Sequence, residues 1–214
     1  MSRYAVIDLE MCKVPKDSRR DEYPHGNEII QIGAVLLDES LEICDSFMTY
    51  VHPEYGYVDS FIEELTGITK ENTANAPGIA EAMRSFLEWI PVDAYIVSWS
   101  ESDLCQICDE LESKNIYYPE LDMYLDDWID CQRIFGDRLD TDRNYRLADA
   151  LNMAAIYYDE GAHDGLVDAK NTALLFAKLE KELELKLSPY LSREEPERGT
   201  SNPFAELLNG LDFS

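Results

Sequence analysis

The sequence predicts an α/β fold in which a mixed five-stranded sheet is flanked by helices. Short apolar, β-prone runs alternate with segments whose apolar residues recur at helical spacing. The second and third runs are separated only by the turn-like Asp38-Glu39-Ser40, a connection that most easily joins antiparallel neighbours. Because 45% of the 214 residues are hydrophobic, the chain can bury one substantial core.

Three strands are expected in the first quarter of the chain. The run 4–7 is short and apolar, and we expect this strand to end at the polar edge formed by residues 8–10. A polar segment, 13–27, follows it. The runs 28–38 and 41–51 are rich in β-prone residues and form the second and third strands.

Helical spacing begins after the third strand. Ile79, Met83, Phe86 and Leu87 form one apolar stripe between the Pro77-Gly78 start signal and the Pro91 stop. The elements expected after this helix are a strand at 94–98, a helix at 101–114, a short strand at 128–130, helical pieces at 131–135 and 147–153, and a long helix at 164–187.

Two parts are expected along the chain, a globular domain at 1–187 and a flexible acidic tail at 188–214. The composition shifts after Leu187 to Ser, Pro, Glu, Arg and Gly, as in a linker. The last residues, 203–213, are apolar enough to dock. Folding back on the parent domain and binding a protein partner are equally compatible with this segment.

Five cysteines at irregular positions fit reduced thiols better than a disulfide framework. Cys105 and Cys108 form the only close pair, and none of the three histidines is paired with another. Two thiols on a helix face are therefore favoured over a zinc knuckle.

The chain is strongly acidic, with 44 Asp and Glu against 18 Lys and Arg and a net charge of −26. This balance disfavours a protein that binds nucleic acid through a basic patch. Residues 109–130 hold eight acids against Lys114 alone, and they have no catalytic explanation. The first residues lack the apolar stretch of a signal peptide, and no later run approaches the ~20 residues of a membrane span. We expect a cytoplasmic protein.

Asp8 and Glu10 are the first candidates for chemistry. Side chains alternate along an extended strand, so the two carboxylates share one side of it. Carboxylates this close repel each other unless a cation or a proton lies between them. Acid pairs at this spacing are common in so acidic a chain, but this pair ends a buried strand, where a functional site is favoured.

Two further segments supply carboxylates. Asp103 falls in the first turn of a helix that follows the strand 94–98, where its simplest role is a favourable charge at a helix N-terminus. His163 lies just before the last helix and Asp168 one turn into it, so a glycine-flanked histidine lies near a rigidly held acid.

Together, Asp8, Glu10, Asp103, His163 and Asp168 resemble, in order and context, the DEDDh branch of the 3′–5′ exonuclease superfamily, which includes ribonuclease T and the ε subunit of DNA polymerase III. The resemblance covers about residues 3–180. It extends to the strand-like Glu28–Val35, to Val51-His52-Pro53, to the loop signature Leu65-Thr66-Gly67-Ile68-Thr69, and to Trp99 and Asp168-Ala169-Lys170-Asn171, which are similar to the Eri-type subgroup. Met11-Cys12 and Ser100 depart from the usual pattern and leave substrate preference open.

The resemblance implies a ribonuclease H-like fold and a two-metal-ion mechanism. Four carboxylates are hard ligands suited to two Mg²⁺ or Mn²⁺ ions. By resemblance, Asp8 bridges the ions, Glu10 and Asp168 complete the shell of the first, and Asp103 holds the second. His163 is then the base that removes a proton from water near neutral pH. The expected products are nucleoside 5′-monophosphates released from the 3′ end of single-stranded RNA or DNA, with RNA favoured.

Substrate contacts are expected on both sides of the carboxylates. The residues implied are Leu9, Met11, Leu65, Thr66, Ile68, Trp99, Lys16 and Arg19. Leu65 and Ile68 would pack against terminal bases, although core packing explains Leu65 equally well. Trp99 is either a stacking platform or a buried anchor, the latter being favoured. Lys16 and Arg19 are expected to touch phosphates.

Two other classes remain as alternatives. A catalytically inactive protein with this fold could bind a basic partner through its acidic surface. It is disfavoured because an idle site has no physical reason to keep repelling carboxylates together. A calcium-binding module is disfavoured because no twelve-residue Asp/Asn/Gly loop is present.

Overall fold

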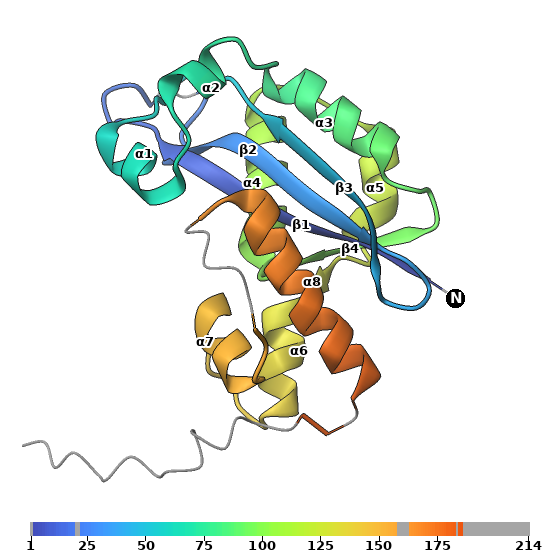
Figure 1. Cartoon of the computed structure of the whole chain (residues 1–214). Helices are drawn as coiled ribbons and strands as arrows, with labels where there is room; N and C mark the ends of the chain where they lie inside the picture. Colours follow the sequence, from blue (N-terminus) through green and yellow to red (C-terminus); the bar gives the residue numbers. More distant parts are fainter. Residues whose placement is uncertain (1, 20–21, 158–162, 183, 186–214) are drawn as a thin grey trace, which may run out of the picture.

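Five strands form one mixed sheet in the computed structural model, which describes residues 2–19, 22–157, 163–182 and 184–185 (Figure 1). The strand order is β3-β2-β1-β4-β5. β1 pairs antiparallel with β2 and parallel with β4, so the expected mixed sheet is confirmed. The strands are β1 (Arg3–Lys13), β2 (Asn27–Leu37), β3 (Ile43–Tyr50), β4 (Ala94–Ser98) and β5 (Ile129–Asp130).

Helices cover both faces of the sheet. α3, α4 and α5 pack on one face, and α6, α7 and α8 pack on the other, where α8 crosses β1 and β2 (Figure 1). The described helices are α1 (Ser60–Thr66), α2 (Lys70–Ala74), α3 (Ile79–Trp89), α4 (Glu101–Ser113), α5 (Pro119–Leu125), α6 (Cys131–Arg138), α7 (Leu147–Met153) and α8 (Gly165–Lys181).

β1 continues past the point where its end was expected. The prediction that the strand stops at Asp8 is wrong, because the ladder with β2 runs on to Lys13 with a bulge between Glu10 and Met11. Side chains still alternate between the two faces of the sheet along this extension. Ile7 and Leu9 enter the core under α3 and α4, while Val6 points to the α8 face. Asp8 and Glu10 therefore follow Val6 on the α8 side of the sheet.

Other element boundaries shift by a few residues. β3 starts at Ile43 rather than at residue 41, and α8 ends at Lys181, where Glu182 is already extended. α1, α2 and α5 were not predicted from the sequence pattern. α1 and α2 are fixed by their caps: the Asp59 side chain accepts a hydrogen bond from Ile62 N, and Thr69 forms a capping box with Asn72.

A buried ion cluster ties α4 to β2. Lys114 Nζ lies 2.6 Å from Glu28 Oε1 and 3.0 Å from Glu110 Oε1, and both glutamates are fully buried. Glu28 also accepts hydrogen bonds from the backbone amides of residues 54–56. Glu110 is one of the eight acids in 109–130, and its role here is structural.

The remaining predictions about organisation have separate outcomes. The five cysteines are free, as expected, and on α4 Cys105 is exposed while Cys108 is half-buried. Within the described residues, no helix is both long and apolar enough to cross a membrane. The tail at 188–214, with its apolar end and expected partner, lies outside the described residues.

Candidate active site

The parallel strands place the first three carboxylates at one edge of the sheet. Ile7 of β1 pairs with Ser98, the last residue of β4. Asp8 therefore lies level with the turn that leads from β4 into α4. Asp103, in the first turn of α4, accepts a hydrogen bond from Leu9 N at 3.2 Å. The backbone between Asp8 and Glu10 therefore holds the Asp103 carboxylate directly. This is the edge at which open α/β sheets bind ligands.

A close helix–strand crossing brings the N-terminus of α8 to these carboxylates. A Cβ atom on Gly33 of β2 would lie 2.2 Å from the carbonyl carbon of Gly165, so only glycine permits this approach. The Gly165 N–H donates to Gln31 Oε1 at 2.7 Å. Asp164 caps the helix by accepting from the N–H groups of Leu166 and Val167. The crossing fixes the start of α8 beside β1.

Glu10, His163 and Asp168 meet at this crossing. One ligand atom from each of the three side chains lies within 4.8 Å of the other two. Among the described residues, no other group of three His, Cys, Asp or Glu side chains meets this spacing. His163 is exposed and has a left-handed backbone with φ of 46°. The histidine thus lies at the mouth of the site, with the two acids beneath it.

The carboxylates raise one another's pKa values. Burial is the largest cause at Asp8, whose pKa rises well above its usual range, and Asp103, Glu10 and Asp168 raise it further. Burial, followed by the charges of Asp168, Asp164 and Asp103, raises the pKa of Glu10 to about 8.

The pKa values of the other two acids are also raised. Burial raises the pKa of Asp103 to about 7, even though the hydrogen bond from Leu9 N lowers it. Burial raises the pKa of Asp168 too, and His163 partly offsets the change. A site in which charged carboxylates are this costly favours protons or cations between them.

The donor set fits divalent cations. The carboxylate oxygens suit Mg²⁺ or Mn²⁺, and a bound cation would offset the repulsion that raises these pKa values. Asp164, whose role the sequence did not reveal, adds negative charge close to Asp8, Glu10 and Asp168.

Three of the expected substrate contacts are buried. Leu9 is 4% exposed and packs in the core beneath α3 and α4. Ile68 is 2% exposed and packs under α1. Thr66 uses its hydroxyl within the same turn, donating to Ile62 O and accepting from Ile68 N. Burial gives these three side chains packing roles in this structure.

The other expected contacts are accessible to different degrees. Met11 and Leu65 are half-buried, and Trp99 is half-buried with its ring centroid 6.3 Å from that of Phe135, as an anchor requires. Lys16 is exposed. The exposed Arg19 side chain folds back on its own segment, because its Nε donates to Val14 O and its guanidinium lies against Gly26.

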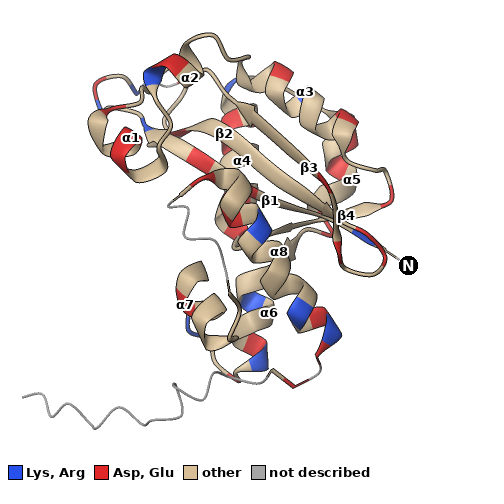
Figure 2. Cartoon of the chain, in the orientation of Figure 1, with Lys and Arg blue, Asp and Glu red and all other residues tan. Residues whose placement is uncertain are grey.

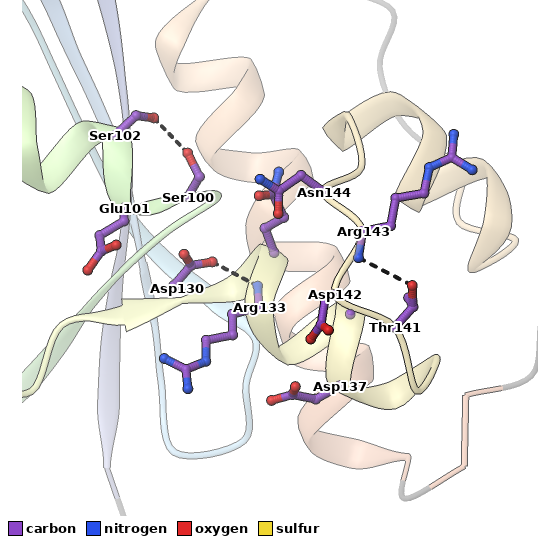
Figure 3. A pocket seen from close by; sticks show the side chains of 12 residues that line it. Ser100, Glu101, Ser102, Asp130, Arg133, Asp137, Thr141, Asp142, Arg143 and Asn144 are labelled. Carbon is purple, nitrogen blue, oxygen red and sulfur yellow. Dashed lines mark hydrogen bonds between the residues drawn. The ribbon is translucent and has the colours of Figure 1, made fainter.

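A polar pocket of about 630 Å³ lies at the carboxyl ends of β4 and β5 (Figure 3). Its lining includes Ser102, which precedes Asp103, and Asp130, whose charge raises the pKa of Asp103. Arg133 and Arg143 also line the pocket, but Figure 3 shows the Arg143 guanidinium extending away from Asp130 and Asp137. The pocket therefore adjoins the carboxylates through Asp103.

Comparison with known proteins gives a consistent match. The family model described as "Exonuclease" matches residues 5–176. A rat protein named 3′-5′ exoribonuclease 1 is 28% identical over 188 residues, which cover 81% of this chain and 52% of the rat protein. A zebrafish protein named ERI1 exoribonuclease 2 is 31% identical, covering 75% of this chain and 32% of that protein. The chain thus spans about half or less of the length of these relatives.

Solved structures share the fold. A 3′-exonuclease, solved in a study of 3′-end-specific recognition of a histone mRNA stem-loop, superimposes with a TM-score of 0.71 at 23% identity, covering 87% of this chain and 66% of that one. Exonuclease I superimposes with a TM-score of 0.64 at 14% identity, covering 83% and 41% of the two chains. These likenesses agree with the ribonuclease H-like fold expected from the sequence.

Proposed function

The chain belongs to the exonuclease family, and on this premise we propose that it is a metal-dependent 3′–5′ exonuclease acting on single-stranded nucleic acid. The observation that carries the proposal is the convergence of Glu10, His163 and Asp168, together with the charge coupling of Asp8 to Asp103. The site adjoins an open polar pocket from which a strand could enter.

The four carboxylates would hold two Mg²⁺ or Mn²⁺ ions. Asp8, whose pKa is raised by burial and by the charges of Asp103, Glu10 and Asp168, would help to hold both ions. Glu10 and Asp168 would complete one ion's ligands and Asp103 the other's. When bound, such ions acidify water and stabilise both the attacking and the leaving oxygens of a phosphodiester displacement.

His163 would act as the general base. It is exposed at the mouth of the site, so its ring can reach a water molecule that approaches a bound phosphodiester. Its position beside Asp168 stabilises the imidazolium that forms when it accepts the proton. The left-handed backbone turns the chain at residue 163 into the capped start of α8, so the histidine is held close to Asp168.

We propose RNA rather than DNA as the preferred substrate, because the rat and zebrafish relatives are both named as exoribonucleases. The half-buried Met11 and Leu65 are apolar side chains that could touch the terminal nucleotides, whereas Trp99 packs against Phe135. Lys16, an exposed cation in the segment after β1, would contact a phosphate. Mononucleotides with a 5′-phosphate are the expected products.

The test is stepwise degradation of a 5′-labelled RNA and of a DNA of the same sequence. With Mn²⁺ the wild-type protein should shorten the RNA from its 3′ end, and excess chelator should stop the reaction. His163→Ala should lower the rate about 10²–10⁴-fold, as loss of a general base does. His52→Ala is the matched control and should leave the rate unchanged, because His52 contacts Thr73 O away from the site.

Two results would count against this proposal. If Mn²⁺ produces no shortening of either oligonucleotide, the protein is not a nuclease of this class. If both histidine variants cleave like wild type, His163 is not the base. Faster cleavage of DNA than of RNA would reverse the proposed preference while leaving the mechanism intact.

A further inference from the structure

Gln31 is a polar side chain in the middle of the most buried strand. It lies in β2 between Ile30 and Ile32, and none of its surface is exposed. Its cross-strand partner on β1 is Glu10. Residues directly opposite each other in adjacent strands share one face of the sheet, so Gln31 and Glu10 both face α8.

One half of the Gln31 amide is committed to α8. Oε1 accepts a hydrogen bond from the Gly165 N–H at 2.7 Å in a buried setting. Because the Gly165 N–H is a donor, the oxygen of the Gln31 amide, and not its nitrogen, must face the helix. Gly165 is the first residue of α8, where a backbone N–H has no partner within the helix.

This bond lies where the helix comes closest to the sheet. A Cβ atom on Gly165 would lie 3.0 Å from Gln31 Oε1 and 3.1 Å from Asp8 O. His163 precedes this contact by two residues, and Asp168 follows it by three. The position of the Gly165 N–H therefore sets where both side chains lie relative to Asp8 and Glu10.

The other half of the amide has no structural use. Gln31 Nε2 is buried without a hydrogen-bond partner among the described residues. A buried polar group left unpaired costs about 1–3 kcal/mol, so an apolar side chain of similar size would serve the core equally well. Stability alone gives no reason for a glutamine here.

We propose that Gln31 is a positioning residue, whose side-chain carbonyl sets the start of α8 so that His163 and Asp168 meet Glu10. The inference rests on the proposed function, since it assigns the residue a task in the same site. Gln31 touches neither metal nor substrate in this account and acts through Gly165.

Gln31→Met is the first variant, because it keeps the volume and removes both polar atoms. In wild type the unpaired donor is Gln31 Nε2, and in the variant it is the Gly165 N–H. Because the number of unpaired donors is the same, the melting temperature without metal should stay close to that of wild type. The Mn²⁺ affinity measured by calorimetry should fall about 10–100-fold, as when a supporting contact of a metal site is lost. With RNA, kcat should fall by about 10²-fold while KM changes little.

Two companion variants separate positioning from packing. Gln31→Glu keeps an oxygen opposite the Gly165 N–H and should restore both Mn²⁺ binding and kcat at saturating metal. Thr172→Val removes another buried polar group, the Thr172 hydroxyl of α8, which has no hydrogen-bond partner within the described part of the chain, and it leaves the Gly165 contact in place. It should leave both quantities unchanged.

The outcomes are decisive in each direction. Wild-type Mn²⁺ affinity in Gln31→Met would overturn the inference, as would a Gln31→Glu protein as impaired as Gln31→Met. A large fall in melting temperature in Gln31→Met would make the role one of packing. If wild type binds Mn²⁺ but cleaves no nucleic acid, the proposed function fails while the Mn²⁺ affinities still decide the role of Gln31.

Discussion

The role proposed for Asp168 in catalysis conflicts with the stability of the metal-free protein. One carboxylate oxygen of Asp168 lies within 4.8 Å of a Glu10 carboxylate oxygen and of a His163 ring nitrogen. Burial raises the pKa of Asp168, so its charged form is costly without a cation. Buried like charges are tolerated in proteins mainly at functional sites, where a ligand relieves them.

Replacing Asp168 should therefore separate the two properties. Asp168→Asn removes one of the repelling charges, so the melting temperature in chelator should rise, while RNA cleavage with Mn²⁺ should fall more than about 100-fold. Mn²⁺ should raise the melting temperature of wild type and have a smaller effect on the variant. Differential scanning calorimetry measures the melting temperatures in chelator and in Mn²⁺, and initial rates on labelled RNA measure cleavage. A variant that is less stable in chelator would show that Asp168 makes a net favourable interaction in the metal-free protein.

At the residue scale, the sequence predicts the acids better than their supports. Asp103 and Asp168 are recognisable because each lies in the first turn of a helix, and Asp8 and Glu10 because they follow a short apolar run. Gln31 carries the signal of a lone polar residue in an apolar run, but its partner, Gly165, is 134 residues away. Pairings over such separations cannot be inferred from local pattern.

At the element scale, the crossing of α8 over β2 is the contact that assembles the site. Gly33→Ala would place a Cβ atom 2.2 Å from the backbone of Gly165 and of Leu166, neither of which can move without shifting the helix. The expected cost is about 1–3 kcal/mol of unfolding free energy, together with a loss of RNA cleavage.

Gly78→Ala is the matched control for this change. A Cβ atom there meets nothing within 4 Å, and φ is −69°, so the substitution should leave cleavage unchanged. Urea unfolding and initial cleavage rates measure the two effects. Equal cleavage rates in the two variants would show that the close crossing is not needed for the site.

The ion cluster holding α4 to β2 makes a pH-dependent prediction. Burial lowers the Lys114 pKa, but Glu110 and Glu28 raise it by more, so it lies above the usual 10.5. Because the folded pKa is raised, the stability that Lys114 provides is complete below about pH 10.5 and is lost as pH rises through the folded value. Lys114→Met removes the cation that the two buried glutamates share, and it should lower the free energy of unfolding by about 3–5 kcal/mol near neutral pH.

Urea unfolding at several pH values tests this window. The difference between wild type and Lys114→Met should be constant from about pH 7 to 10 and should shrink above about 10.5. Lys70→Met, at an exposed position on α2, should change stability by less than about 0.5 kcal/mol throughout. A difference that shrinks below pH 9 would mean that the Lys114 pKa is not raised.

At this scale, the long periodic segments were predicted, and so were the short elements β5, α6 and α7, whereas α1, α2 and α5 were not. The apolar stripe of α3 and the strands β2 and β4 follow directly from spacing. α1, α2 and α5, of five to seven residues, are specified by caps and by tertiary contacts instead. The extension of β1 beyond Asp8 depends on its pairing with β2. The charged residues at 8 and 10 give no local sign of this pairing.

At the scale of the whole molecule, the net charge of −26 opposes the approach of a polyanion. Acidic residues lie on most elements in Figure 2, whereas Lys and Arg are most evident on α6 and along α8. Long-range repulsion of this kind is screened by salt, with a Debye length of about 10 Å at 0.1 M. Contact with the substrate must then come from the site and its few neighbouring side chains.

Salt should therefore accelerate the proposed RNA cleavage at low ionic strength. With saturating Mn²⁺, kcat/KM on RNA should rise as monovalent salt increases from about 0.01 to about 0.1 M, because screening reduces the repulsion between protein and RNA. Initial rates on a short labelled RNA measure this dependence. A steep fall over the same range would indicate binding by displacement of counterions from many phosphate contacts.

The central claim is that the converging carboxylates and His163 direct water at a terminal phosphodiester. Mass spectrometry of the products formed from RNA in ¹⁸O-labelled water, with Mn²⁺ present, tests it most directly. The account predicts nucleoside 5′-monophosphates carrying one ¹⁸O on phosphorus, and none in Asp168→Asn. Products with a 3′-phosphate, or labelled products formed equally well in excess chelator, would contradict it.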